Sequence, residues 1–222
     1  MNKDLSMTEK YTLLMLYGGG ARTDFMACQF TAGIVLGGLW ELTQRQDFSI
    51  GGDHKLLVPD SAGEAMVGFS TLYGNLGRQP ARSMQSWLSY YCFQPTYKNV
   101  RPVVDDVLGA LAEKGFLRIT WRPGFFRKKR IVEINAEQAD VVVEEFIAAV
   151  QSNQDRDEII FCTEMLLLAD VFKSYFPMGK RLRIKSTLER YKHAELWRTM
   201  EPYANAVRNF NYQNAVYTGA TQ

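Results

Sequence analysis

The sequence predicts a mainly α-helical, single-domain fold built around one buried hydrophobic helix, with short β-hairpins, one of them projecting. Three observations lead to this prediction. Most segments carry apolar residues at helical spacing, one glycine-bearing segment is apolar nearly all round, and strand-like alternation flanks a turn between 116 and 134. At 222 residues the chain suits one large domain or two small ones, and we predict one domain over 1–222.

The buried helix is the segment from 25 to about 43, which has glycines at 33, 37 and 38. A membrane span needs about 20 predominantly apolar residues, whereas Gln29 and Thr31 interrupt this segment and Glu41 stands near its end. A helix that is apolar nearly all round is typical of the centre of a soluble bundle. We therefore expect this helix in the core, with its glycines where neighbouring helices approach closely.

Caps, breakers and apolar spacing place the other elements. Ser6 or Thr8 can cap a first helix that Gly18 ends, and Gly51-Gly52 joins two short strands expected at 47–50 and 55–58. The remaining predicted elements are a short helix within 62–73, helices at 83–92, 100–114, 136–152, 157–175 and 180–208, and strands at 116–122 and 125–134.

Residue sets typical of catalysis or metal binding are absent from the sequence. It has no GxSxG or HExxH motif and no paired-carboxylate motif, and Cys28, Cys92, Cys162, His54 and His193 are scattered. We predict a non-enzymatic protein with no catalytic residues, metal or cofactor. The cysteines are expected to be buried free thiols in a reducing compartment. No secretory signal is evident, so a cytoplasmic location is expected.

The strongest local signal is basic, although the net charge of the chain is only +2. Between Arg118 and Arg130, in the predicted strand pair and its turn, the chain carries six cations and no acid: Arg118, Arg122, Arg127, Lys128, Lys129 and Arg130. At the turn, Phe125 and Phe126 stand beside them. Exposed rings next to cations suit an anionic membrane surface, where each cation adds about 1 kcal/mol. Alternatively, the rings pack on this chain, on a second copy or on a partner protein.

Four stretches spread over nearly the whole chain form a recognisable series. They are Met7-Thr-Glu-Lys with Leu13-Leu-Met-Leu, Ala32-Gly-Ile-Val-Leu-Gly-Gly-Leu-Trp-Glu-Leu with Arg45, Leu111-Ala-Glu-Lys-Gly-Phe-Leu, and a weaker Glu164-Met-Leu-Leu-Leu-Ala-Asp. In this order they resemble the Golgi phosphoprotein 3 family of peripheral membrane proteins. The chain starts directly at the domain, without the long N-terminal extension of eukaryotic members, which favours a divergent, prokaryotic relative.

The resemblance implies a helical domain around a buried hydrophobic helix and a projecting hairpin used in self-association, hence a homo-oligomer. It also implies a pocket for phosphatidylinositol 4-phosphate on the cytosolic face of membranes. Eukaryotic members hold Golgi enzymes by their short cytosolic tails, so the resemblance implies protein clients as well.

The family's lipid pocket contains a tryptophan and three arginines. In this chain the corresponding places hold Met26, Val35, Arg101 and Val104, so only Arg101 matches, with Lys98 close to it. Phosphate groups favour several charge-assisted hydrogen bonds, ideally from arginine. The resemblance therefore implies headgroup binding by Arg101 and Lys98, to phosphatidylinositol 4-phosphate or to another anionic phospholipid.

A different interpretation of residues 100–134 is a winged-helix DNA-binding domain. In that fold the hairpin would be the wing, and its cations would contact phosphates. The helix at 100–114 carries Asp105 and Asp106, which are expected to be solvated and would repel DNA. It also lacks the Arg, Asn, Gln and Ser content typical of a recognition helix. Nucleic acid is therefore the less favoured partner.

Overall fold

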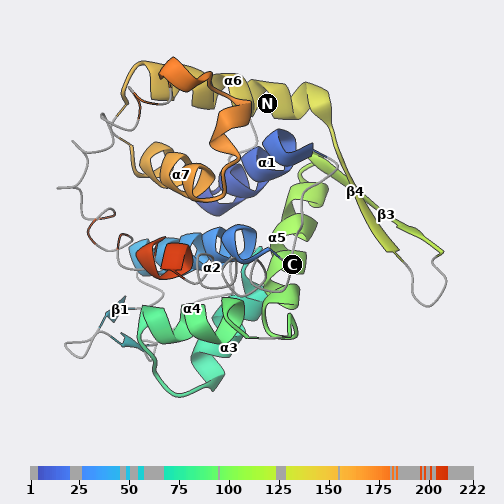
Figure 1. Ribbon diagram of the computed structural model, residues 1–222. Helices are drawn as coiled ribbons and strands as arrows, with labels where there is room; N and C mark the ends of the chain where they lie inside the picture. The colour runs from blue at the N-terminus through green and yellow to red at the C-terminus, as the bar shows by residue number, and fades with distance from the viewer. Residues whose placement is uncertain are drawn as a thin grey trace, which may run out of the picture.

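The computed structural model describes residues 5–20, 27–45, 49–50, 55–57, 68–94, 96–123, 129–154, 156–180, 182, 184, 196, 198, 201 and 204–209. These residues form a mainly helical single domain with a projecting antiparallel hairpin, which confirms the predicted fold class (Figure 1). The elements are α1 (Met7–Gly19), α2 (Cys28–Gln44), β1 (Ser49–Ile50), β2 (Leu56–Leu57), α3 (Ser70–Arg78), α4 (Met84–Cys92), α5 (Val100–Glu113), β3 (Leu117–Arg122), β4 (Lys129–Ile134), α6 (Ala136–Gln151), α7 (Asp157–Leu168) and the 3-10 helix η2 (Phe172–Ser174).

Helix α2 is the buried centre of the domain. Every residue from 30 to 42 except Glu41 is buried, and Figure 1 shows α2 between α1 and α7 on one side and α3 and α4 on the other. The helix has 17 residues. Among the helices that the structure describes, none is long and apolar enough to cross a membrane.

The glycines of α2 lie where other helices come close, as expected. A Cβ atom on Gly33 would lie 2.2 Å from ring carbons of Tyr11, and one on Gly37 would lie 2.4 Å from the hydroxyl oxygen of Thr8. On another side of the helix, a Cβ atom on Gly38 would meet side chains of the α3 region at 2.8 Å. Ordinary contacts are longer than these distances, so the packing of α1 against α2 depends on glycine at 33 and 37.

Helix α3 lies further along the chain than the expected short helix within 62–73. Residues 62–67 of that range lie outside the described residues, and the helix runs from Ser70 to Arg78, with Gly74 and Gly77 inside it. The hydrogen-bond donors of its first turn find an acceptor on α5. The Asp106 carboxylate accepts hydrogen bonds from the Thr71 N–H at 2.7 Å and the Ser70 hydroxyl at 2.8 Å. This contact between distant residues is not visible in the local sequence pattern.

Helix α7 is shorter than the predicted helix at 157–175. It ends at Leu168, and Asp170 then adopts a left-handed φ of 57° before η2 begins. In the predicted helix at 180–208, the residues that the structure describes are helical. All three cysteines are free thiols; Cys92 and Cys162 are buried, and Cys28 is partly buried.

Candidate functional site

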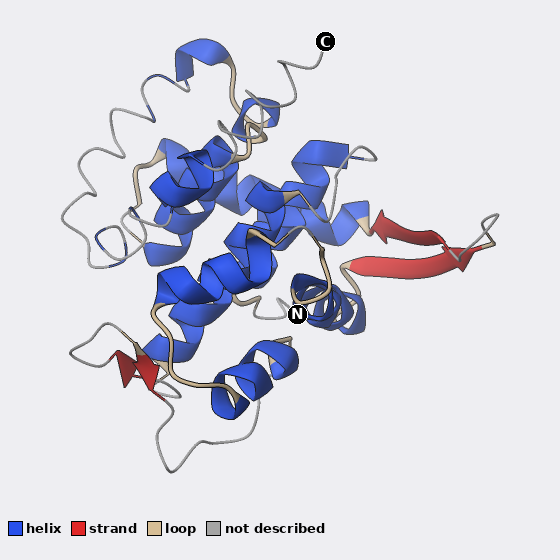
Figure 2. Cartoon of the chain, turned by 60° about the horizontal axis from the view of Figure 1, so that its bottom comes forward, coloured by secondary structure: helices blue, strands red, loops and turns tan. Residues whose placement is uncertain are grey.

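The β3–β4 hairpin, here called the arm, projects from the helical body (Figure 2). The two strands are antiparallel, and their register runs from Leu117 opposite Ile134 to Arg122 opposite Lys129. The base of the arm lies against the core, where Leu117 is buried. The outer part of each strand therefore extends beyond the body.

Both strands are anchored where they leave the body. Gly115, with a φ of 84°, ends α5 just before β3. Asn135 lies between β4 and α6, and its N–H donates to the Phe116 carbonyl at 2.9 Å while its side-chain amide donates to the Gly115 carbonyl at 3.1 Å. These two hydrogen bonds link the residue that follows β4 to the residues that precede β3.

Directly opposed residues share a face of a hairpin, so the register gives the arm two different faces. The inner face carries Leu117, Ile119, Trp121, Arg130, Val132 and Ile134, and its apolar residues nearest the base pack on the core. The outer face carries the side chains of Arg118, Thr120, Arg122, Ile131 and Glu133. Arg118 and Arg122 are exposed, so the outer face presents cations to solvent.

Trp121 is a site candidate that sequence reasoning missed. Its side chain is 60% exposed, whereas Trp40 and Trp87 are buried. By alternation it belongs to the same face as Leu117 and Ile119, which a sequence pattern assigns to the core. Trp121 is exposed because the arm continues past the body. The signal that could have revealed it is the proximity of Trp121 to the predicted turn.

The inner face also contacts α5 through an ion pair between Arg130 and Asp105. The side chain of Arg130 is 17% exposed and that of Asp105 is 46% exposed. Asp106 is engaged with the first turn of α3, as described above. Asp105 is exposed and Asp106 partly buried, and each carboxylate also has a protein partner that the sequence pattern does not indicate.

The predicted turn residues Phe125, Phe126, Arg127 and Lys128 lie outside the described residues. The structure places Lys129 at the start of β4. Of the predicted hairpin residues, Arg130 forms an ion pair with Asp105.

Of the two predicted headgroup-binding residues, Lys98 lies in the turn before α5 and Arg101 in its first turn, and both are exposed. Val35 and Val104, at two of the family's pocket places, are completely buried in the core and cannot contact a headgroup. Met26 lies outside the described residues. Arg101 and Lys98 are therefore accessible to a ligand, whereas Val35 and Val104 cannot line a pocket for it.

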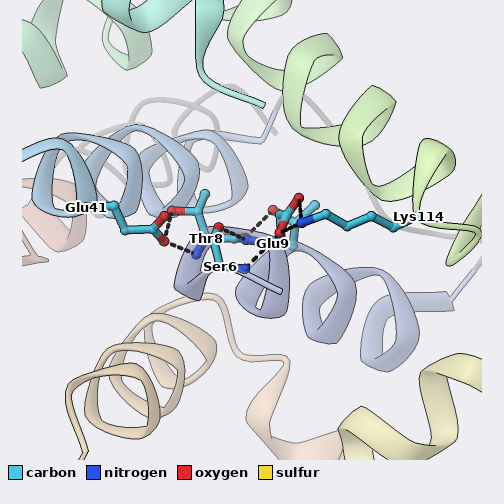
Figure 3. A network of polar contacts seen from close by, with 6 residues as sticks. Ser6, Thr8, Glu9, Glu41 and Lys114 are labelled. Atoms are coloured by element: carbon cyan, nitrogen blue, oxygen red, sulfur yellow. Dashed lines mark hydrogen bonds and ion pairs between the residues drawn. The ribbon is translucent and has the colours of Figure 1, made fainter. Parts of the chain in front are cut away.

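A second polar cluster joins α1, α2 and α5 (Figure 3). Ser6 and Glu9 form a capping box at the start of α1, and the buried Glu9 carboxylate accepts Lys114 Nζ at 2.6 and 2.8 Å. From α2, Glu41 accepts the N–H of Thr8 at 2.6 Å and its hydroxyl at 3.0 Å. Since Lys114 lies three residues before β3 begins, its pairing with Glu9 fixes the base of the arm.

Burial raises the pKa of the Glu41 carboxyl above the ordinary value of 4.5, while the hydrogen bonds from Thr8 oppose that rise. Ser6 and Glu9 also face this carboxyl. A raised pKa means that the folded protein keeps this proton at pH values where the unfolded chain has lost it. The contribution of Glu41 to stability is therefore greatest at acidic pH and falls as pH rises from the mid-fours through the folded-state pKa.

Glu41→Gln is expected to remove this loss of stability at higher pH, because the amide oxygen can accept the same hydrogen bonds from Thr8 without carrying a charge. Parent and variant should be similarly stable below pH 4, where both groups are neutral, and the variant should be the more stable at pH 7. Urea unfolding at several pH values measures the difference. A difference that does not change with pH would contradict the assignment.

Among the residues that the structure describes, no group of three or more His, Cys, Asp or Glu side chains is placed to hold a metal ion. The structure combines an arm that has an exposed tryptophan and exposed arginines with a helix that carries Arg101 in its first turn and Lys98 just before it. Neither a protein-family model nor a curated protein matches this chain, so its function has to be inferred from this site.

Proposed function

We propose that this chain is a peripheral membrane protein that binds the anionic surface of a phospholipid bilayer through the arm, without acting as an enzyme. The observation that carries the proposal is the exposure of Trp121 on an element that projects from the body. Tryptophan favours the membrane interface because its ring is apolar and its N–H is polar. Arg118 and Arg122 on the outer face supply attraction to anionic lipids.

Two features of the sequence support the same function. The turn between the strands contains Phe125 and Phe126 followed by Arg127 and Lys128, which adds apolar and cationic groups to the arm. The series of motifs resembling the Golgi phosphoprotein 3 family implies a peripheral protein on the cytosolic face of a membrane. The same resemblance extends the proposal to self-association through the arm and to protein clients.

The proposed ligand is an anionic phospholipid, either phosphatidylinositol 4-phosphate or another acidic lipid, with Arg101 and Lys98 contacting the headgroup. Both side chains are exposed at the start of α5. Since Val35 and Val104 are buried, the chain offers fewer specific contacts than the family pocket. We therefore expect a preference for negative charge that is broader than recognition of one lipid.

Trp121→Ala is expected to weaken binding to anionic vesicles by about tenfold to a hundredfold, because burial of a large apolar side chain contributes roughly 1.5–3 kcal/mol. Sedimentation with vesicles of phosphatidylcholine alone and with 30% phosphatidylglycerol (about one lipid in three, a strongly anionic surface) measures the effect. The parent should bind only the anionic vesicles and lose affinity as salt is added. Its tryptophan emission should shift to shorter wavelength, and the shift should shrink in Trp121→Ala.

Met178→Ala is the matched control, because Met178 is an exposed apolar side chain on another part of the molecule. Phe125→Asp with Phe126→Asp tests the turn, and Arg101→Ala with a lipid panel tests headgroup preference. Parent-like binding by both Trp121→Ala and the double aspartate variant would refute membrane binding through the arm. Salt-sensitive binding to duplex DNA without binding to vesicles would instead favour the winged-helix interpretation.

A further inference from the structure

The contact between Arg130 and Asp105 links the outer part of the arm to α5. Arg130 is directly opposite Trp121 in the register, so the two side chains share the inner face. Arg130 keeps little exposure, while almost half of the Asp105 side chain is open to solvent. The guanidinium is thus held in place, and the carboxylate lies on the solvent side of the pair.

The surroundings of this pair are suited to an anion. Figure 1 shows the arm leaving the C-terminal end of α5 and diverging from that helix, so the angle between them opens toward the start of α5. Arg101 lies four residues before Asp105, which places both on one face of the helix. Arg101 therefore lies one helical turn before the carboxylate that Arg130 contacts, so α5 carries a second exposed cation on the face that bears Asp105.

We propose that Asp105 occupies an anion site formed by the arm and α5, and that the phosphate of an anionic phospholipid takes the place of Asp105 on Arg130 when the arm meets a membrane. This inference rests on the proposed function and adds a regulatory and specificity-determining residue to it. Guanidinium groups bind carboxylates and phosphates in the same geometry. A partly exposed ion pair is weak, so the displaced carboxylate can return to water.

Asp105 then acts against binding in two ways. It must be released from Arg130, and its negative charge faces the lipid surface. Neutral and weakly acidic membranes cannot displace it, whereas a surface rich in phosphate charge can. The carboxylate therefore raises the amount of anionic lipid that the chain needs before it binds.

Asp105→Asn is expected to bind vesicles with 30% phosphatidylglycerol (about one acidic lipid in three) roughly fivefold more tightly than the parent, as one added cation near an anionic surface would. It should also bind at a lower fraction of acidic lipid. Arg130→Gln should weaken binding, and in that background Asp105→Asn should give clearly less than the fivefold gain. Full-length variants with parent-like melting temperatures are compared in a double-mutant cycle.

Glu144→Gln is the control, since it makes the same change in net charge at an exposed position on α6. Equal gains from Asp105→Asn with and without Arg130, or an equal gain from Glu144→Gln, would overturn the inference while leaving membrane binding intact. If the parent itself does not bind anionic vesicles, the proposed function is refuted instead. Millimolar inorganic phosphate that blocks vesicle binding would show that the site takes free phosphate as well as a lipid headgroup.

Discussion

Gly33→Ala is expected to lower the free energy of unfolding by about 3 kcal/mol or more, at the upper end of the overpacking range. The added Cβ atom would lie 2.2 Å from the Tyr11 ring. That ring cannot move aside easily, because it is completely buried, packs edge-on against Phe161 at 5.7 Å, and donates its hydroxyl to the Gln29 carbonyl at 2.9 Å. The two central helices would have to separate.

The measurement is thermal unfolding followed by circular dichroism, with an expected fall in Tm of roughly 10 °C for a chain of this size. Gly109→Ala in α5 is the matched control, because a Cβ atom there meets nothing within 4 Å. Alanine is favoured over glycine inside a helix by up to about 1 kcal/mol, so this variant should melt at or above the parent. A Gly33→Ala variant that melts like the parent would show that α1 and α2 are not packed as described.

Lys114→Met is expected to destabilise the fold by about 2–4 kcal/mol, because it leaves the Glu9 carboxylate buried without its cation. Glu9 is 2% exposed as a residue. Since the Lys114 side chain is 29% exposed, water replaces part of the lost interaction, and we place the effect below the full cost of an isolated buried charge. Urea unfolding of parent and variant gives the difference.

Glu9→Gln combined with Lys114→Met should recover much of that loss. Glutamine can still complete the capping box with Ser6, and the buried negative charge is gone. The double variant should therefore be more stable than Lys114→Met alone. If the stability changes of Glu9→Gln and Lys114→Met, each measured alone, add up to that of the double variant, Glu9 and Lys114 do not interact.

Much of the fold could be predicted from local signals in the sequence. The spacing of Gly33 and Gly37 indicated close helix packing, and of the two predicted caps of the first helix, Ser6 and Thr8, the structure confirms Ser6. Helix α3 was misplaced because its start depends on Asp106, 35 residues away from Thr71. Local patterns carry no information about a cap supplied from another helix.

The candidate site was only partly predictable. The run of cations and the alternation of residues identified the arm but did not single out Trp121, because it alternates in step with Leu117 and Ile119 as a core-facing residue would. The partner of Arg130 is Asp105, 25 residues away in the sequence, and the partner of Lys114 is 105 residues away. Such pairs depend on how helices meet in space, which spacing along the chain does not encode.

The two closely tied feet of the arm have a mechanical consequence. Few residues join the strands to helices α5 and α6, and Asn135 bonds across the two connections, so we expect the arm and both helices to turn together. A molecule bound to a bilayer through the arm would have one fixed tilt relative to the membrane. Copies bound to the same membrane would then present the same side to one another.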